Sequence, residues 1–239
     1  MGDSVSVSII VPVYEDNDNS VIVNIGALVH KLNELGIEEY ELIVFSSIKR
    51  YLTFPDYLIS NKKIIFVGLR RKLGVGSIFR KGIQIADKEY VGLIPPYNQV
   101  SLESLKGILA ALKDRDIVVS YIKNPKVRSW HRIIASAVNT LIVNWLFGLK
   151  LKYYHLSFYR TSLVKKVGIT GDSHAAMIEA AVWMVKSGAN IAQVPFIMIP
   201  HKFKSKSRAF GIGNITNIFK TYLLLFCQVM ILRKRINLN

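Results

Sequence analysis

The first half of the chain alternates short apolar runs with segments that carry apolar residues at helical spacing. The short runs are rich in Val and Ile and predict buried strands, whereas the spaced segments predict helices. The predicted strands cover residues 6–13, 40–45, 63–67, 90–94 and 116–121, and the predicted helices cover residues 21–35, 74–86 and 102–112. This alternation is typical of a mainly parallel sheet with helices on its faces, so the sequence predicts an α/β fold.

Polar residues that follow the predicted strands define a candidate ligand site. The carboxyl ends of parallel strands meet at one edge of a sheet, and ligands of open α/β folds bind there. This rule places Tyr14, Asp16, Ser46, Ser47 and residues 95–97 on one rim. The tyrosine and the aspartate could stack on a nucleoside and hydrogen-bond to it, and the alternative is a solvated loop.

The second half of the chain predicts longer apolar helices and a basic loop. The predicted elements are helices at residues 132–147, 179–187 and 215–232, a strand at residues 191–199 and a basic loop at residues 202–208. We therefore divide the chain into an α/β domain, residues 1–211, and a C-terminal apolar and basic helix, residues 212–239. That helix is expected to contact a membrane interface or another copy of the chain.

Charge changes this picture by pointing to an anionic partner. The 239 residues carry a formal net charge of +16, and the only acidic residues after Asp116 are Asp172 and Glu179. Such asymmetry is typical of proteins that bind nucleic acid or an anionic membrane. Nucleic acid is the weaker alternative, because the basic residues are not interleaved with aromatic residues in a recognisable reader. The single cysteine, Cys227, excludes an internal disulfide and fits a reducing compartment.

Several segments in order resemble a known family. They are Ser-Ile-Ile-Val-Pro-Val-Tyr-Glu-Asp at residues 8–16, Lys-Leu-Gly-Val-Gly-Ser at residues 72–77, Asp-Ile-Val-Val-Ser at residues 116–120 and the helix that contains Glu179. Over residues 6–210 the chain resembles the family 2 glycosyltransferases of the dolichyl-phosphate mannose synthase type. The resemblance implies a GT-A-type fold, a nucleotide-sugar donor, a polyprenyl-phosphate acceptor and a location at the cytoplasmic face of a membrane, peripheral or monotopic.

The resemblance also implies which residues bind the nucleotide. They are Pro12, Tyr14, Asp16, Ser46, Gly74 and Gly76. The two glycines would let backbone approach a ligand closely, and the helix behind them would offer free N–H groups. The alternative is a plain turn between a strand and a helix. On the first interpretation, Gly76→Val abolishes nucleotide binding and leaves the melting temperature nearly unchanged.

The acidic motifs of the family are replaced in this chain. The metal-binding Asp-x-Asp motif falls on Pro95, Pro96 and Tyr97, and a later family acid falls on Tyr153. Because Mg²⁺ and Mn²⁺ need oxygen ligands such as carboxylates, we expect no divalent metal on this rim and no other cofactor.

Basic residues of the 202–208 loop could neutralise a diphosphate or a lipid phosphate instead of a metal. The candidate phosphate and lipid ligands are Lys202, Lys204, Lys206 and Arg208, of which Lys202 and Arg208 are the candidate catalytic residues. The alternative is a solvated basic patch that faces a membrane.

Two functions remain open from the sequence. One is a polyprenyl-phosphate sugar transferase that works without metal, and the other is an inactive pseudo-glycosyltransferase that acts as a membrane-bound scaffold. Residues 221–232 carry no charge and would cover roughly 20 Å as a helix, which is less than the ~30 Å hydrocarbon core of a bilayer. We therefore expect this segment to lie in the membrane interface, and the alternatives are an oligomer contact or a core helix.

Overall fold

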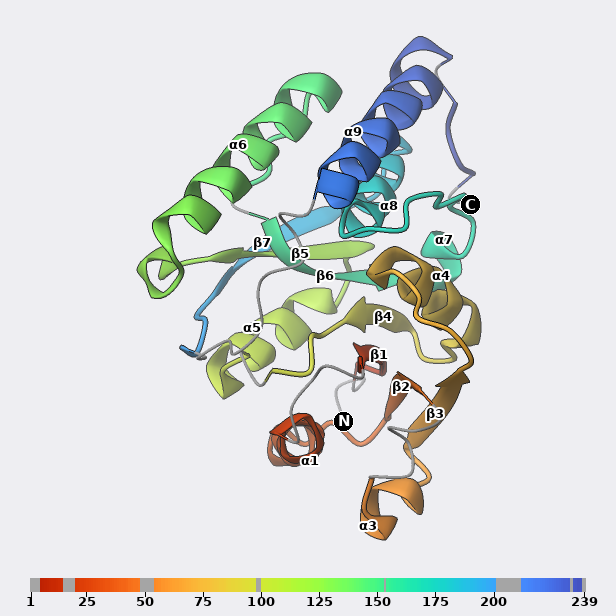
Figure 1. Ribbon diagram of the computed structural model, residues 1–239, viewed down its shortest axis with the longest axis vertical. Coiled ribbons are helices and arrows are strands. Elements are labelled where there is room, and N and C mark those ends of the chain that lie inside the picture. Colours follow the sequence, from red (N-terminus) through yellow and green to blue (C-terminus); the bar gives the residue numbers. More distant parts are fainter. Residues whose placement is uncertain are drawn as a thin grey trace.

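The computed structural model describes residues 5–14, 20–47, 54–97, 100–152, 154–200, 212–232 and 234–237, and every structural statement below concerns these residues. Their strands form a seven-stranded sheet in the order β3-β2-β1-β4-β6-β5-β7 (Figure 1). The strands are β1 (Val7–Pro12), β2 (Tyr40–Ser47), β3 (Ile64–Leu69), β4 (Tyr90–Leu93), β5 (Ile117–Ile122), β6 (Tyr154–Arg160) and β7 (Ile191–Phe196). Strand β6 is antiparallel to β4 and β5, and the other pairings are parallel. The prediction of a mainly parallel α/β fold is confirmed.

Helices cover both faces of the sheet (Figure 1). One face is covered by α1 (Ser20–Glu34), α3 (Asp56–Ile59) and α5 (Leu102–Leu112). The other face is covered by α4 (Val75–Ile85), α6 (Trp130–Phe147), α7 (Thr161–Val164), α8 (Ala175–Lys186) and α9 (Ile212–Phe226). Strand β1 is buried along its whole length, as expected for a central parallel strand. Its Ile9 packs on the first layer of helices, and its Ile10 packs on the second.

Most predicted elements match the structure, and the differences are local. Helix α8 begins four residues before the predicted start at residue 179. The strand predicted at residues 191–199 ends at Phe196, and beyond it Met198 forms a single bridge to Val100. The last predicted helix divides into α9 and a π-helical turn, η3 (Cys227–Ile231). A short 3₁₀ turn, η1 (Pro125–Val127), precedes α6.

Carboxylates that support the fold collect at the amino ends of the strands. Glu41 is buried at the start of β2 and accepts hydrogen bonds from the Ser8 hydroxyl at 2.6 Å and the Asp87 N–H at 2.8 Å. Arg160, at the end of the antiparallel β6, pairs with Glu89 at 2.8 Å and Asp116 at 3.2 Å. These three carboxylates therefore lie at the edge of the sheet opposite the predicted rim.

Helix α9 supplies side chains to the core of the α/β domain. Tyr222 and Leu225 of α9 and Val229 of η3 are buried in the cluster that also contains α8. The Tyr222 hydroxyl donates to Asn139 Oδ1 of α6 at 2.9 Å. The segment expected to form a separate C-terminal contact thus packs against the domain, and no helix in the described part of the chain is both long and apolar enough to cross a bilayer.

Candidate functional site

The register of the sheet brings the predicted rim together at the carboxyl ends of β2, β1 and β4. Pro12 lies opposite Phe45, and the Val13 N–H donates to the Phe45 carbonyl at 2.8 Å. On the other side, the Ile94 N–H donates to the Ile10 carbonyl at 3.0 Å. Residues that follow these pairs therefore share one edge: Tyr14, Ser46, Ser47, Pro95, Pro96 and Tyr97. Asp16, which was predicted for the same edge, lies outside the described residues.

The described side chains of this rim do not suit a divalent cation. They offer prolines, hydroxyls and phenols, whereas Mg²⁺ and Mn²⁺ are held mainly by carboxylates. Within the residues that the structure describes, no group of three or more His, Cys, Asp or Glu side chains could hold a metal ion. A metal-free rim stays a prediction, because Asp16 belongs to the same edge in the sequence.

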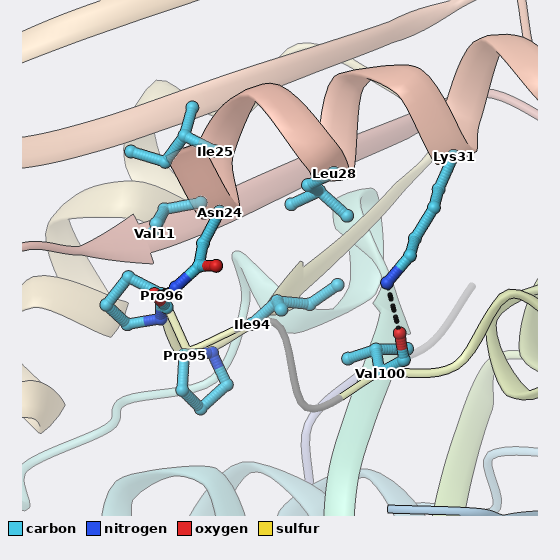
Figure 2. A pocket seen from close by; sticks show the side chains of 9 residues that line it. All are labelled: Val11, Asn24, Ile25, Leu28, Lys31, Ile94, Pro95, Pro96 and Val100. Atoms are coloured by element: carbon cyan, nitrogen blue, oxygen red, sulfur yellow. Dashed lines mark hydrogen bonds between the residues drawn. The ribbon is translucent and has the colours of Figure 1, made fainter. Parts of the chain in front are cut away.

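Helix α1 fixes the segment that is predicted from the family resemblance to replace the metal motif (Figure 2). Asn24 Nδ2 donates to the Pro96 carbonyl at 3.0 Å, and Lys31 Nζ donates to the Val100 carbonyl at 2.6 Å. Burial lowers the pKa of Lys31, and the negative charge of Glu34 opposes that shift. The apolar recess between α1 and this segment has room for about one water molecule, so it is too small to hold a nucleotide.

The Gly74–Gly76 turn makes its close approach to the protein's own backbone. The Gly76 N–H donates to the Asp172 carbonyl at 2.9 Å. A Cβ atom on Gly76 would lie 2.7 Å from the Asp172 carbonyl carbon and closer still to the Gly171 carbonyl oxygen. A Cβ atom on Gly74 would meet the Asp172 carbonyl oxygen in the same way. The expectation that Gly76→Val leaves stability unchanged is therefore wrong, and the role of both glycines in nucleotide binding stays a prediction.

Asp172 places a carboxylate at the start of α4. Its Oδ1 accepts a hydrogen bond from the Ser77 hydroxyl and forms an ion pair with Arg80 Nη2 at 2.6 Å. The Ser77 hydrogen bond, followed by the Arg80 interactions, holds the pKa of Asp172 below its ordinary value. Sequence reasoning noted this residue only as a rare acid and missed its place at the turn. Its rarity was the available signal, because an acid among many basic residues attracts a cation such as Arg80.

Glu179 holds the segment that packs against the glycine turn. Its buried carboxylate accepts hydrogen bonds from the Thr170 N–H, the Thr170 hydroxyl and the Gly171 N–H at 2.8–3.1 Å. The carboxylate is committed to these donors, so the structure gives it the role of an anchor. The family resemblance had pointed to this glutamate without specifying that role.

A run of exposed cations follows β3 on the same edge of the sheet. Ser46 and Ser47 pair with the last two residues of β3, and Arg70, Arg71 and Lys72 come directly after them. All three cations are exposed, so this end of the rim is positively charged. The glycine motif in the sequence included Arg71 and Lys72, and Arg70 was not singled out. The other candidate residues, Tyr153, Lys202, Lys204, Lys206 and Arg208, lie outside the described residues.

Comparison with solved structures shows the class of fold. The chain is similar to glucosyl-3-phosphoglycerate synthase from Mycobacterium tuberculosis in complex with Mg²⁺ and UDP, with a TM-score of 0.61 and 12% identity over 93% of this chain and 78% of that one. The same enzyme with Mn²⁺, UDP-glucose and phosphoglyceric acid gives a TM-score of 0.60 and 13% identity over 93% and 79% of the two chains. No family model and no curated protein matches the sequence.

The protein therefore has the GT-A-type fold of these nucleotide-sugar glycosyltransferases, which confirms the fold predicted from the sequence motifs. Identity this low shows the fold alone. The dolichyl-phosphate mannose synthase subtype stays a prediction.

Proposed function

We propose that the protein binds a nucleotide sugar on the β2–β1–β4 rim and transfers the sugar to a polyprenyl phosphate at the cytoplasmic face of a membrane. The observation that carries the proposal is the rim itself. The GT-A-type fold extends over 93% of the chain. Within it, the strand ends carry an aromatic residue, Tyr14, and two serine hydroxyls at the positions where the family resemblance implies paired acids.

The chemistry of the acceptor fits a site without a general base. In the transfer, a phosphate oxygen of the lipid forms a bond to the anomeric carbon of the sugar. The bond from that carbon to the nucleotide diphosphate breaks, and the leaving diphosphate takes the electron pair. A phosphate monoester is already largely ionised at pH 7, because its second pKa is about 6, so its oxygen needs no base to become nucleophilic. Glu179 is then free to serve only as an anchor.

The leaving diphosphate needs positive charge in place of the metal. Lys202 and Arg208 are the proposed donors, because charge-assisted hydrogen bonds are the strong ones toward phosphate. The cations after β3 add positive potential to the same edge of the sheet, three strand positions from β4. Neighbouring strands lie about 4.8 Å apart, so cations that are three strands away from β4 are too distant to act on the bond that breaks. We therefore assign them the role of attracting the nucleotide electrostatically.

Calorimetry with UDP-, GDP- and other nucleotide sugars, with and without Mn²⁺, tests the binding step. We expect binding that Mn²⁺ does not improve. Tyr14→Ala should weaken it roughly ten- to a hundredfold through loss of stacking on the base. Tyr57→Ala is the matched control, because Tyr57 is 63% exposed on α3, in the opposite helix layer from the glycine turn. Absence of binding at millimolar concentration would remove the donor site from the proposal.

A second candidate function is an inactive scaffold that retains the fold. The observation that favours it is the firm attachment of Pro96 and Val100 to α1, which makes the former metal segment a structural part of the layer. Incubation with nucleotide sugar and polyprenyl phosphate separates the two functions. Slow metal-independent formation of glycolipid supports transfer, whereas binding without product supports the scaffold.

A further inference from the structure

Helix α6 carries an apolar stripe on the side that faces away from the core. Only Val143 and Phe147 of its 18 residues are buried. Its exposed apolar side chains follow each other at intervals of three, four or one residues and lie along one side of the helix: Trp130, Ile134, Val138, Leu141, Ile142 and Trp145. The two tryptophans at its ends are 73% and 82% exposed. So large an apolar stripe in water indicates a surface that binds a partner.

Helix α9 extends this surface beside α6 (Figure 1). The two helices are joined by the hydrogen bond from Tyr222 to Asn139, and the rings of Phe147 and Phe226 lie 6.4 Å apart. The exposed apolar side chains of α9 and of the turn after it are Phe219, Leu223, Leu224, Ile231 and Leu232. We call these residues, together with the stripe on α6, the α6–α9 face.

The charged residues that helices α6 and α9 themselves carry are all positive. The sequence contains no Asp or Glu between Asp116 and Asp172, or after Glu179, so neither helix carries a carboxylate. The basic residues on these helices or within a few positions of their described ends are Lys126, Arg128, Arg132, Lys150, Lys152, Lys220, Lys234 and Arg235. An anionic surface is complementary to this arrangement. A second copy of the chain would place cations opposite cations, which costs binding energy.

We propose that the α6–α9 face docks on an anionic lipid bilayer, with α6 lying in the plane of the interface. Helix α6 is about 27 Å long, and its charged neighbours at both ends favour an interfacial over a spanning position. Tryptophan prefers the boundary between headgroups and hydrocarbon, which suits the two ends of the stripe. The basic residues then contact acidic headgroups.

Docking in this way brings the candidate site close to the lipid. The chain leaves the sheet at the carboxyl end of β5 to form η1 and α6, and it returns to the same edge at the start of the antiparallel β6. Both ends of α6 therefore connect to the edge that carries the rim. The inference rests on the proposed function in one respect only, namely that docking would present a lipid phosphate to that rim. Docking itself is measured as binding to vesicles, which requires no sugar transfer.

Sedimentation of the full chain with vesicles tests the proposal. Wild-type protein should bind vesicles that contain phosphatidylglycerol, and binding should weaken in high salt and on pure phosphatidylcholine. Leu141→Glu places a charge in the stripe and should lower binding at least roughly tenfold, the effect of about 1.4 kcal/mol. Val23→Glu is the matched control, because Leu141 and Val23 are 72% and 69% exposed and lie in opposite helix layers. Trp145→Ala should also lower binding without affecting folding.

Each outcome decides the proposal. Selective loss of binding in Leu141→Glu, with nucleotide affinity and melting temperature unchanged, supports it. Equal binding of Leu141→Glu and Val23→Glu overturns it. The proposal is also overturned if the wild-type protein does not bind anionic vesicles, or if it forms dimers in sedimentation analysis that Leu141→Glu disrupts. Loss of nucleotide binding alone would count against the proposed function and leave the docking surface intact.

Discussion

Substitution of Gly76 by alanine tests whether the glycine turn serves the fold. The added Cβ would meet the backbone of Gly171 and Asp172, including the Asp172 Cα at 2.8 Å. Backbone atoms cannot move aside as a flexible side-chain end can, so the turn and the 170–172 segment must separate. That segment is held from the other side by Glu179, which makes the separation more costly.

The magnitude follows from overpacking and a weakened hydrogen bond. Inserting a methyl group into a tight contact costs about 1–3 kcal/mol, and loss of the Gly76–Asp172 hydrogen bond adds about 1 kcal/mol. A loss of roughly 2–4 kcal/mol is a large part of the total stability of a typical domain, about 5–15 kcal/mol. For a chain of this size it corresponds to a fall in melting temperature of roughly 5–15 °C.

Thermal and urea unfolding, followed by circular dichroism, measure this effect. Gly107→Ala is the control, because Gly107 lies within α5 and a Cβ there would meet nothing within 4 Å. That change should leave the protein as stable as wild type or stabilise it by up to about 1 kcal/mol. If Gly76→Ala melts with the wild type, the packing argument fails and the turn is free to serve a ligand, as the sequence motif first indicated.

Three further outcomes are expected. The lowered pKa of Asp172 means that its contribution to stability is present above its ordinary pKa of 3.8 and is lost as the pH falls through the lower pKa of the folded state. Asp172→Asn should therefore lower the urea midpoint at pH 7, and the difference from wild type should disappear at strongly acidic pH. Lys202→Ala and Arg208→Ala should each lower sugar transfer roughly ten- to a thousandfold while nucleotide binding persists, and equal turnover in the variants would exclude the basic loop from catalysis. A crystal soaked in Mn²⁺ and nucleotide should show no anomalous peak near Tyr97, and a well-occupied peak there would restore metal-dependent transfer.

The strands of the parallel part of the sheet could be predicted because their burial on both faces imposes continuous apolar runs. The run in β1 is the clearest case, and the rule on strand ends then placed Tyr14 and Ser46 on one rim. The antiparallel β6 escaped prediction since its sequence, Tyr-His-Leu-Ser-Phe-Tyr-Arg, mixes polar and aromatic residues without such a run. The neighbouring strands of β6 are determined by the ion pairs of Arg160 and by pairing between residues far apart in the sequence. A local sequence pattern cannot reveal either.

At the candidate site, the sequence predicted which residues matter but not what they contact. Gly74 and Gly76 were singled out as positions where a side chain would block a ligand, whereas in the structure the room for a side chain is already occupied. What fills that room is a segment almost a hundred residues later, and a motif does not say whether a glycine meets a ligand or the chain itself. The sequence also could not predict that Leu141 is exposed, because an apolar helix can be either buried in the core or bound to a membrane.

The place of β6 in the sheet has a consequence for the order in which the newly made chain can fold. In the described sheet, β6 lies between β4 and β5 and joins β3-β2-β1-β4 to β5-β7. Those four strands and α1 can pair once residue 93 has left the ribosome. Strand β5 then emerges without a partner and must wait for residues 154–160. During that interval one edge of β4 is open, so we expect the nascent chain to be most prone to aggregation between the synthesis of β4 and that of β6.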